Sequence, residues 1–265
     1  MEKGRFDPSR WSEYGGYEKK GTKQRPRRLE PRKYEIFPEL AEWFIFSEHC
    51  HVYPRIVAVR HGRLLVDQGY GRVQIGSYQT HDRYPPSFTN GCPVDILLET
   101  MNREGIDMAN LTQAQAHGYW NDYVADCVKK WPDRFIGSAC VDMDFDDLTM
   151  EELEHWNAKG LTSMNFMLHL AEPEADWTKK FPIVLGNPEF HFNAPWMDRF
   201  YEKFAEWRWT LYLDIPRRGP EEMIKSVLKE LEEVMQRYPE INFIQEHFCF
   251  PSFLLWEERM RLCAD

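Results

Sequence analysis

The sequence is short of several features that assign proteins to common classes. No uninterrupted apolar run approaches the ~18–20 residues of a membrane-spanning helix, and residues 1–33 hold no hydrophobic stretch like that of a signal peptide. Positive charge is also scarce, since 33 Lys and Arg stand against 43 Asp and Glu, a formal net charge of −10. Nucleic-acid binding depends on clustered cationic side chains. We therefore expect no nucleic acid and no membrane as partner, and a cytoplasmic location.

Paired cysteines and glycine-rich nucleotide-binding loops are missing as well. None of the six cysteines stands at the C-x-x-C spacing of structural zinc or redox sites, and a chain of this length needs no disulfide framework, so buried free thiols are expected. Neither G-x-G-x-x-G nor G-x-x-x-x-G-K-[ST] occurs. The two common nucleotide-binding versions of an α/β fold therefore lose support.

The sequence does contain enough apolar surface for a folded domain of enzyme size. Aromatic residues make up 15% of the 265 residues and include 10 Trp, which a disordered chain would not carry. Residues 1–40 differ, because they are polar and basic with interspersed Gly and Pro. We expect them to form an N-terminal arm, either solvated or wrapped around a partner subunit, and residues 41–265 to form one domain.

Short apolar segments alternate with segments of helical period along that domain. Six strand–helix units in a row, without clustered hairpin turns, predict an α/β fold with a parallel sheet covered by helices. Two connections are long, residues 52–93 and 168–194, and the first contains apolar segments that suggest a small hairpin. The expected strands are 44–46, 106–112, 134–142, 160–167, 209–214 and 241–244, and the expected helices are 94–104, 119–130, 148–158, 195–207, 220–238 and 253–262.

Histidines follow the first and the last of these strands. His49 and His51 are separated by one residue, so strand alternation places both side chains on one face, where two imidazoles can bind a divalent metal. In a barrel, His247 would face the same rim, and three imidazoles with an open position are the ligands of a catalytic zinc. Glu48 and Glu246 flank these histidines, and the same alternation predicts that both carboxylates point away.

Five segments along the chain match one known pattern. They are the His49-Cys-His51 triplet, residues 97–111, Trp131-Pro-Asp-Arg-Phe-Ile-Gly137, residues 158–162 and residues 243–247. In these segments the sequence resembles the amidohydrolase superfamily, in particular the amidohydrolase-related branch that includes aminocarboxymuconate semialdehyde decarboxylase and resorcylate-type decarboxylases. The likeness spans about residues 44–260, so it is specific even though no single motif is.

The resemblance implies a (β/α)8 TIM-barrel-like fold and a metal centre built from four side chains. The implied metal ligands are His49, His51, His247 and Asp214, of which the last stands where the family usually presents a fifth-strand histidine. An aspartate makes the ligand set harder, and its alternative is a helix-capping carboxylate. His247 and Asp214 are also the expected catalytic groups. The ion is expected to be zinc, with manganese or iron as alternatives.

The residues that follow the fourth and fifth strands are candidates for binding a small-molecule substrate. Arg217 can clamp a substrate carboxylate in a bidentate manner, although a solvated arginine before a helix is an equal alternative. Asn165 and His169, at the end of the fourth strand, are expected to face the pocket. The resemblance implies decarboxylation of a small aromatic or cyclic carboxylate, or hydrolysis of a lactone or amide.

Two departures from the family pattern leave other functions open. Six of the eight barrel units are visible, and the family's strand-eight aspartate has no counterpart before Asp265, so we expect a barrel that is short at its C-terminal end and completed by further sequence or by a partner chain. A homo-oligomer, or a hetero-oligomer with a related subunit, is therefore expected. The alternatives to a hydrolase or carboxy-lyase are an iron-type oxygenase, favoured by the aspartate, and a non-catalytic barrel subunit.

Overall fold

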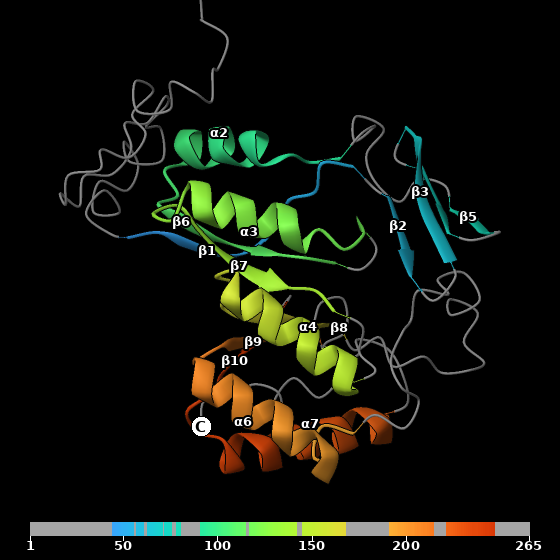
Figure 1. The fold of residues 1–265 in the computed structure, drawn as a ribbon, viewed down its shortest axis with the longest axis vertical. Coiled ribbons are helices and arrows are strands. Elements are labelled where there is room, and N and C mark those ends of the chain that lie inside the picture. Colours follow the sequence, from blue (N-terminus) through green and yellow to red (C-terminus); the bar gives the residue numbers. More distant parts are fainter. Residues whose placement is uncertain are drawn as a thin grey trace, which may run out of the picture.

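Six parallel strands form the main sheet, and their spatial order is their order along the chain. The strands are β1 (Phe46–His51), β6 (Met108–Thr112), β7 (Phe135–Ala139), β8 (Ser163–Met167), β9 (Thr210–Asp214) and β10 (Asn242–Gln245) (Figure 1). The computed structural model describes residues 44–55, 57–60, 63–70, 72–75, 78–80, 91–114, 117–141, 145–167, 191–214 and 221–246.

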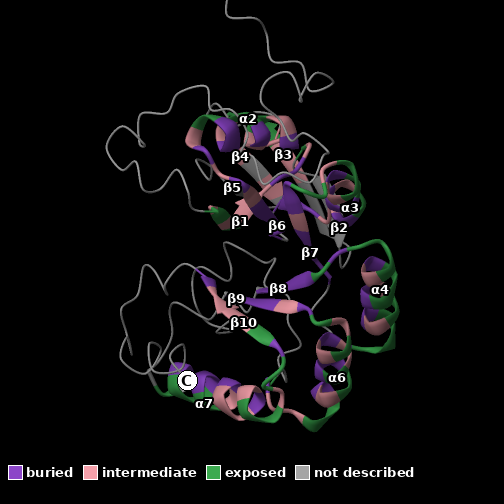
Figure 2. Cartoon of the chain, turned by 90° about the vertical axis from the view of Figure 1, so that its left-hand side faces the viewer, coloured by how far each residue is buried: buried purple, intermediate pink, exposed green. Residues whose placement is uncertain are grey.

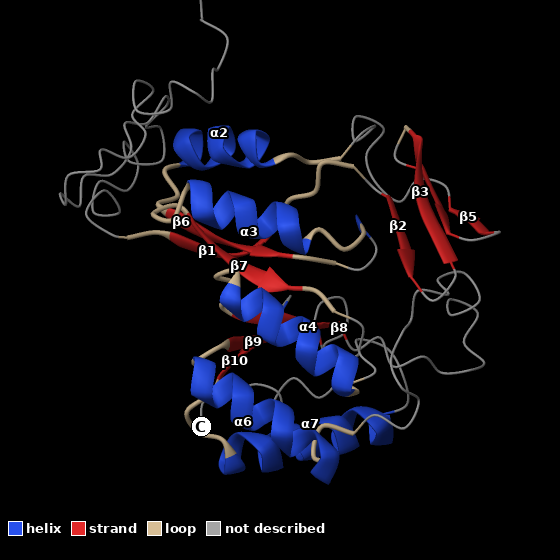
Figure 3. Ribbon diagram, viewed as in Figure 1, coloured by secondary structure: helices blue, strands red, loops and turns tan. Residues whose placement is uncertain are grey.

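Helices connect the strands and cover one face of the sheet. They are α2 (Val94–Glu104), α3 (Asn121–Lys130), α4 (Asp147–Ala158), α6 (Asp198–Trp207), which follows the short 3₁₀ helix η4 (Pro195–Met197), and α7 (Glu221–Arg237) (Figure 3). Parallel neighbours need such crossover connections. This arrangement of a curled parallel sheet with alternating helices is part of a TIM barrel, as the sequence predicted.

The helices bury an apolar stripe against the outer face of the sheet, which Figure 2 shows as their purple surfaces. Along α7 these buried residues recur at helical spacing. Ile224, Val227, Leu228, Leu231 and Val234 are all buried in the main hydrophobic core. The opposite, concave face of the sheet is polar instead.

On the concave face, hydroxyl and amide side chains from three neighbouring strands bond to one another. Asn110 on β6 donates to Oγ of Ser138 on β7 at 3.2 Å, and the hydroxyl oxygens of Ser138 and Ser163 on β8 lie 2.6 Å apart. All three residues are fully buried. Buried polar groups need such partners, so this network accounts for polar residues in the middle of otherwise apolar strands.

The connection between β1 and α2 along the chain forms a separate antiparallel sheet. It consists of β2 (Val57–Arg60), β3 (Arg63–Gly69), β4 (Arg72–Ile75) and β5 (Tyr78–Thr80), paired in that order (Figure 1). The hairpin predicted in this connection is therefore part of a larger, four-stranded sheet. Two backbone hydrogen bonds between Tyr53 and Cys92, of 2.9 and 2.8 Å, join the beginning and the end of the connection that carries this sheet.

Most predicted elements agree with the structure, and the first strand is the clearest exception. The helix predicted at 94–104 is confirmed with both of its ends. The strand predicted as a buried segment at 44–46 instead begins at Phe46, and Phe44 and Phe46 are 67% and 39% exposed. Among the described strands β1 is the outermost of the sheet, and the described residues do not cover this apolar segment on both faces. The predicted arm at 1–40 and helix at 253–262 lie outside the described residues.

The four cysteines among the described residues are all free thiols. Two of them, Cys127 and Cys140, are buried, and burial raises the pKa of Cys127 to about 12. This agrees with the expected absence of a disulfide framework in this part of the chain. Within the described residues, no helix combines the length and the apolar character that crossing a membrane requires.

Two residues of the segment Trp131–Gly137, Arg134 and Gly137, hold the start of β7 against its neighbours. Arg134 is buried, and its guanidinium donates to the backbone carbonyls of Asp107 and Ile106 at 2.8 and 3.0 Å. Gly137 lets α3 approach the sheet, because an added Cβ would lie 2.6 Å from Cγ1 of Val124. These contacts explain why an arginine and a glycine stand in this short apolar segment.

The substitution Gly137→Ala tests this close approach. We expect it to lower the free energy of unfolding by ~1–3 kcal/mol, because an extra methyl in a packed core displaces its neighbours. Urea unfolding of the two proteins measures the difference. The exposed Thr162→Ala nearby should change stability by less than ~0.5 kcal/mol. A Gly137→Ala protein as stable as wild type would contradict the packing described here.

Candidate metal centre

A β-bulge in β1 sets the direction of its histidines. Ser47 pairs with Ala109 and Cys50 with Leu111, so three steps along β1 match two along β6 and one extra residue is inserted. The bulge brings Ser47 and Cys50 to the same side, where their Oγ and Sγ atoms lie 3.2 Å apart. Cys50 packs against the hydrophobic core, while His49, inside the bulge, and His51, after it, present their rings to the concave face.

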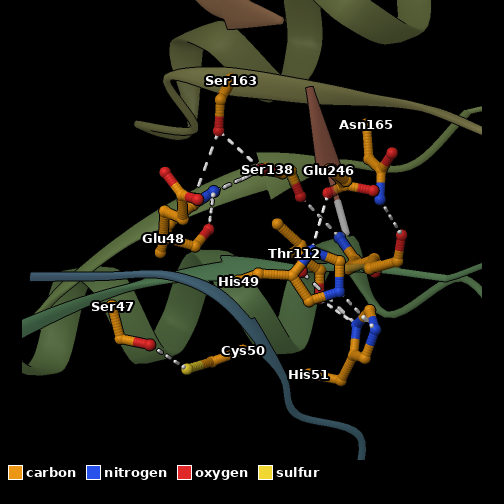
Figure 4. A network of polar contacts seen from close by, with 12 residues as sticks. Ser47, Glu48, His49, Cys50, His51, Thr112, Ser138, Ser163, Asn165 and Glu246 are labelled. Carbon is orange, nitrogen blue, oxygen red and sulfur yellow. Dashed lines mark hydrogen bonds and ion pairs between the residues drawn. The ribbon is translucent and has the colours of Figure 1, made fainter. Parts of the chain in front are cut away.

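The two histidines of β1 converge on one point. Nε2 of His49 and Nε2 of His51 are 3.0 Å apart, with the rings edge to face at a centroid distance of 4.6 Å (Figure 4). Two nitrogen ligands of a tetrahedral zinc, each at ~2.0–2.1 Å from the metal, would be ~3.3 Å apart. The spacing is therefore close to that of two ligands of one ion, and the shared direction predicted from the H-x-H triplet is observed.

The second nitrogen of each ring has its own partner. Nδ1 of His51 lies 3.1 Å from the backbone oxygen of Thr112 on β6, and a carbonyl can only accept, so Nδ1 carries the proton. Nδ1 of His49 lies 2.8 Å from Oε1 of Glu246, a second acceptor. In the neutral imidazoles both Nε2 atoms then carry lone pairs that face each other. Such a pair is stable with a cation between them, either a shared proton or a metal ion.

Glu246 is the residue whose place the sequence predicted wrongly. Its side chain is 2% exposed and contacts His49, with the distance of an ion pair but without the linear geometry of a hydrogen bond. The alternation along β10 was counted from His247. In the structure Phe243 packs against the hydrophobic core. Because side chains alternate along a strand, Ile244 and Glu246 then point to the concave face.

A stacked aromatic pair supports His51 from the loop after β6. The ring of His117 stacks on Tyr53 at 4.1 Å and 21°, and meets the ring of His51 edge to face at 4.9 Å. Tyr53 and His117 are both buried. Sequence reasoning did not single out either residue. The one available signal was that His117 follows the carboxyl end of a strand, as the metal-binding candidates do.

Tyr212 of β9 lies near both carboxylates that flank the histidines. Burial raises the pKa of this phenol to about 12, the charges of Glu48 and Glu246 add to the rise, and a hydrogen bond with Asn110 opposes it. Glu48 is exposed in β1 and acts on Tyr212 through its charge. A neutral hydroxyl thus lies among groups that carry negative charge.

Asn165 of β8 is the one predicted substrate-binding residue whose side chain the structure describes. It is buried, and its Nδ2 donates to the backbone oxygen of Gln113 at 3.4 Å, next to the carbonyl that holds His51. Its Oδ1 is buried and has no hydrogen-bond partner among the described residues. A buried amide oxygen of this kind requires a donor.

The other predicted site residues are only partly placed. Asp214 ends β9, where its backbone pairs with Met167, and its side chain lies outside the described part of the structure. His247, Arg217 and His169 also lie outside the described residues. Within the described ranges, no group of three or more His, Cys, Asp or Glu side chains is arranged to hold a metal. The roles of Asp214, His247, Arg217 and His169 as ligands, catalytic groups or substrate contacts stay predictions.

A comparison with protein families identifies the chain at the family level. The sequence model described as amidohydrolase matches residues 49–265, which is most of the chain and starts at His49. The chain belongs to the amidohydrolase family. The resemblance seen in the sequence is therefore confirmed. A search of curated proteins found no match.

Three solved structures with similarity to this chain are a hydrolase, a putative hydrolase and a decarboxylase. A probable 2-pyrone-4,6-dicarboxylic acid hydrolase from Acinetobacter baumannii, with citric acid bound, is 17% identical with a TM-score of 0.51, and the match covers 83% of this chain and 66% of that protein. A putative 2-pyrone-4,6-dicarboxylic acid hydrolase from Pseudomonas putida is 14% identical with a TM-score of 0.48, covering 84% and 65%. A 5-carboxyvanillate decarboxylase from Novosphingobium aromaticivorans, complexed with manganese, is 18% identical with a TM-score of 0.39, covering 56% and 47%. The chain thus spans about two thirds or less of each of these proteins' length.

The raised pKa of Tyr212 predicts a late step in the alkaline titration of the folded protein. The folded state holds the phenol proton more tightly than the unfolded chain, whose tyrosines titrate near pH ~10. Its contribution to stability is therefore present below pH ~10 and is lost as the pH rises through about 12. Phenolate absorbance after rapid pH jumps should show a step near pH 12 to which both Tyr212 and Tyr123 contribute. The Tyr212→Phe protein should lose one tyrosine's share of that step, while the share of Tyr123 remains. A Tyr212→Phe protein that instead lacks a step near pH 10 would contradict the assignment.

Proposed function

We propose that this amidohydrolase-family chain is a metal-dependent enzyme that acts on a small aromatic or cyclic carboxylate. The reaction is loss of the carboxylate as carbon dioxide, or hydrolysis of a lactone or amide in such a molecule. Family membership supports an enzyme. The name of the hydrolase from Acinetobacter baumannii, whose fold this chain shares, supports a cyclic carboxylate as substrate.

The observation that carries the proposal is the convergence of two imidazole nitrogens on the concave face. Both Nδ1 atoms face acceptors, so both Nε2 lone pairs point at one position that calls for a cation. Metal-binding histidines typically donate their second nitrogen to a carboxylate or a backbone carbonyl, and this chain provides one of each. His49 and His51 therefore fit a divalent metal, with zinc first and manganese or iron as alternatives.

The reaction needs an electrophilic centre, which this site would hold at the carboxyl ends of the strands. A divalent cation, when bound, polarises a substrate oxygen or lowers the pKa of water. His49 and His51 hold the ion, while Glu246 and the carbonyl of Thr112 keep their rings oriented. Asn165 presents a buried oxygen that accepts a proton donor such as a substrate hydroxyl. The predicted roles of His247, Asp214 and Arg217 complete the proposal.

Neither alternative function gains support from the structure or the family. An iron-type oxygenase and a non-catalytic subunit were suggested by departures at positions outside the described side chains. The geometry of the described site agrees with a hydrolase or carboxy-lyase without either assumption. A cytoplasmic location and an oligomeric state stay predictions from the sequence.

Metal analysis of the purified protein tests the metal centre. We expect about one divalent ion per chain, reduced to a small fraction in a His49→Ala/His51→Ala double variant, because the two convergent ligands are removed together. A matched control is His155→Ala, since His155 lies in α4 away from β1. No stoichiometric metal in the wild type, or full metal content in the double variant, would contradict the proposal.

Activity assays then separate the two reactions. Purified metal-loaded protein is offered a set of hydroxybenzoates and a set of cyclic lactone carboxylates, and release of carbon dioxide or ring opening is measured. We expect turnover in one of the two sets, lost by ~100-fold or more in the double variant because the metal activates the reacting oxygen. Oxygen consumption with any of these compounds would favour the oxygenase instead.

A further inference from the structure

We infer that Glu246 is a positioning residue that holds His49 with its proton on Nδ1 and directs the Nε2 lone pair toward the metal position. This inference rests on the proposed metal centre and adds a residue that neither the H-x-H motif nor the four expected ligands include.

Among the described residues, the carboxylate of Glu246 has one close polar partner, the imidazole of His49. The Glu246 side chain is 2% exposed, and Oε1 lies 2.8 Å from Nδ1 of His49. A buried carboxylate is costly without a positively polarised partner. At this distance two lone pairs would repel, so the nitrogen that faces the carboxylate carries the proton. Nε2, the only other ring nitrogen, is then the ligand.

The two histidines differ in what stands behind them. Nδ1 of His51 faces a neutral carbonyl, that of Thr112, at 3.1 Å, whereas Nδ1 of His49 faces a carboxylate oxygen at 2.8 Å. A charged acceptor increases the basicity of the imidazole and strengthens its bond to a metal. Removing the carboxylate should therefore weaken one ligand and leave the other in place.

The same contact connects the two outer strands of the sheet. β1 and β10 are at opposite ends of the strand order β1-β6-β7-β8-β9-β10 and share no strand pairing. His49 lies in β1 and Glu246 directly follows β10. Their contact crosses the concave face (Figure 4), so a residue after the last described strand helps to position a side chain of the first.

Zinc titration of Glu246 variants tests the inference. The metal-free protein is titrated with zinc alone in competition with a chromophoric chelator, for wild type, Glu246→Gln and Glu246→Ala. Losing a partner of this kind typically costs ~10–100-fold in metal affinity, so we expect that loss in Glu246→Ala and a smaller loss in Glu246→Gln, whose amide oxygen can still accept from Nδ1. The matched control is Glu230→Gln, because Glu230 makes a similar contact, 2.9 Å to His191, on the surface.

A second measurement separates positioning from a merely structural role. Nitrogen-15 NMR of the histidines in metal-free protein, at a pH where the imidazoles are neutral, reports which ring nitrogen carries the proton. We expect His49 to be protonated on Nδ1 in wild type and to shift toward the Nε2–H form in Glu246→Gln and Glu246→Ala, while His51 stays Nδ1-protonated in all three.

The outcomes distinguish this inference from the proposed function. A wild-type protein that binds no zinc overturns the metal centre, and the tautomer of His49 still decides the role of Glu246. Wild-type zinc affinity in a folded Glu246→Ala protein overturns the inference alone. An Nε2-protonated His49 in the metal-free wild type overturns it as well, even where both variants prove too unstable for titration.

Discussion

The site depends on two imidazole nitrogens that face each other 3.0 Å apart on the concave side of the sheet. Two neutral acceptors repel each other at this distance and a cation between them relieves the repulsion, and each ring faces an acceptor at its other nitrogen. The bulge in β1, the position of β6 and the end of β10 all serve this arrangement. An amino-acid change at any of these three places would act on the metal position.

The fold supplies this geometry by separating apolar and polar faces. The helices bury the outer face of the sheet, which becomes the rigid core, while the inner face keeps buried hydroxyl and amide groups that satisfy one another. A carboxylate and an uncharged phenol can therefore lie below the histidines without water. Electrostatic interactions are stronger in such an environment, which suits a site that must hold a cation.

Local patterns accounted for most of the fold and for the strand that carries the two convergent histidines. The helix at 94–104 was predictable because its apolar spacing and its terminal glycine agree, and the H-x-H triplet was predictable because alternation is a property of the chain itself. The face occupied by Glu246 was not, because it depends on which residue of β10 packs against the helices. Tyr53 and His117 are 64 residues apart, and no local pattern brings their rings together.

The amino-acid sequence by itself determined the order of strands and helices, the parallel sheet, the family and the pair of histidines, because each of these follows from short-range periodicity or from motifs. The tertiary structure decided which nitrogen of each histidine faces the metal position, that Glu246 stands behind His49, and that β1 and β10 meet across the concave face. Those features arise from contacts between segments far apart in the chain, 61 residues for His51 and Thr112 and nearly 200 for His49 and Glu246. Their geometry exists only once the sheet has curled.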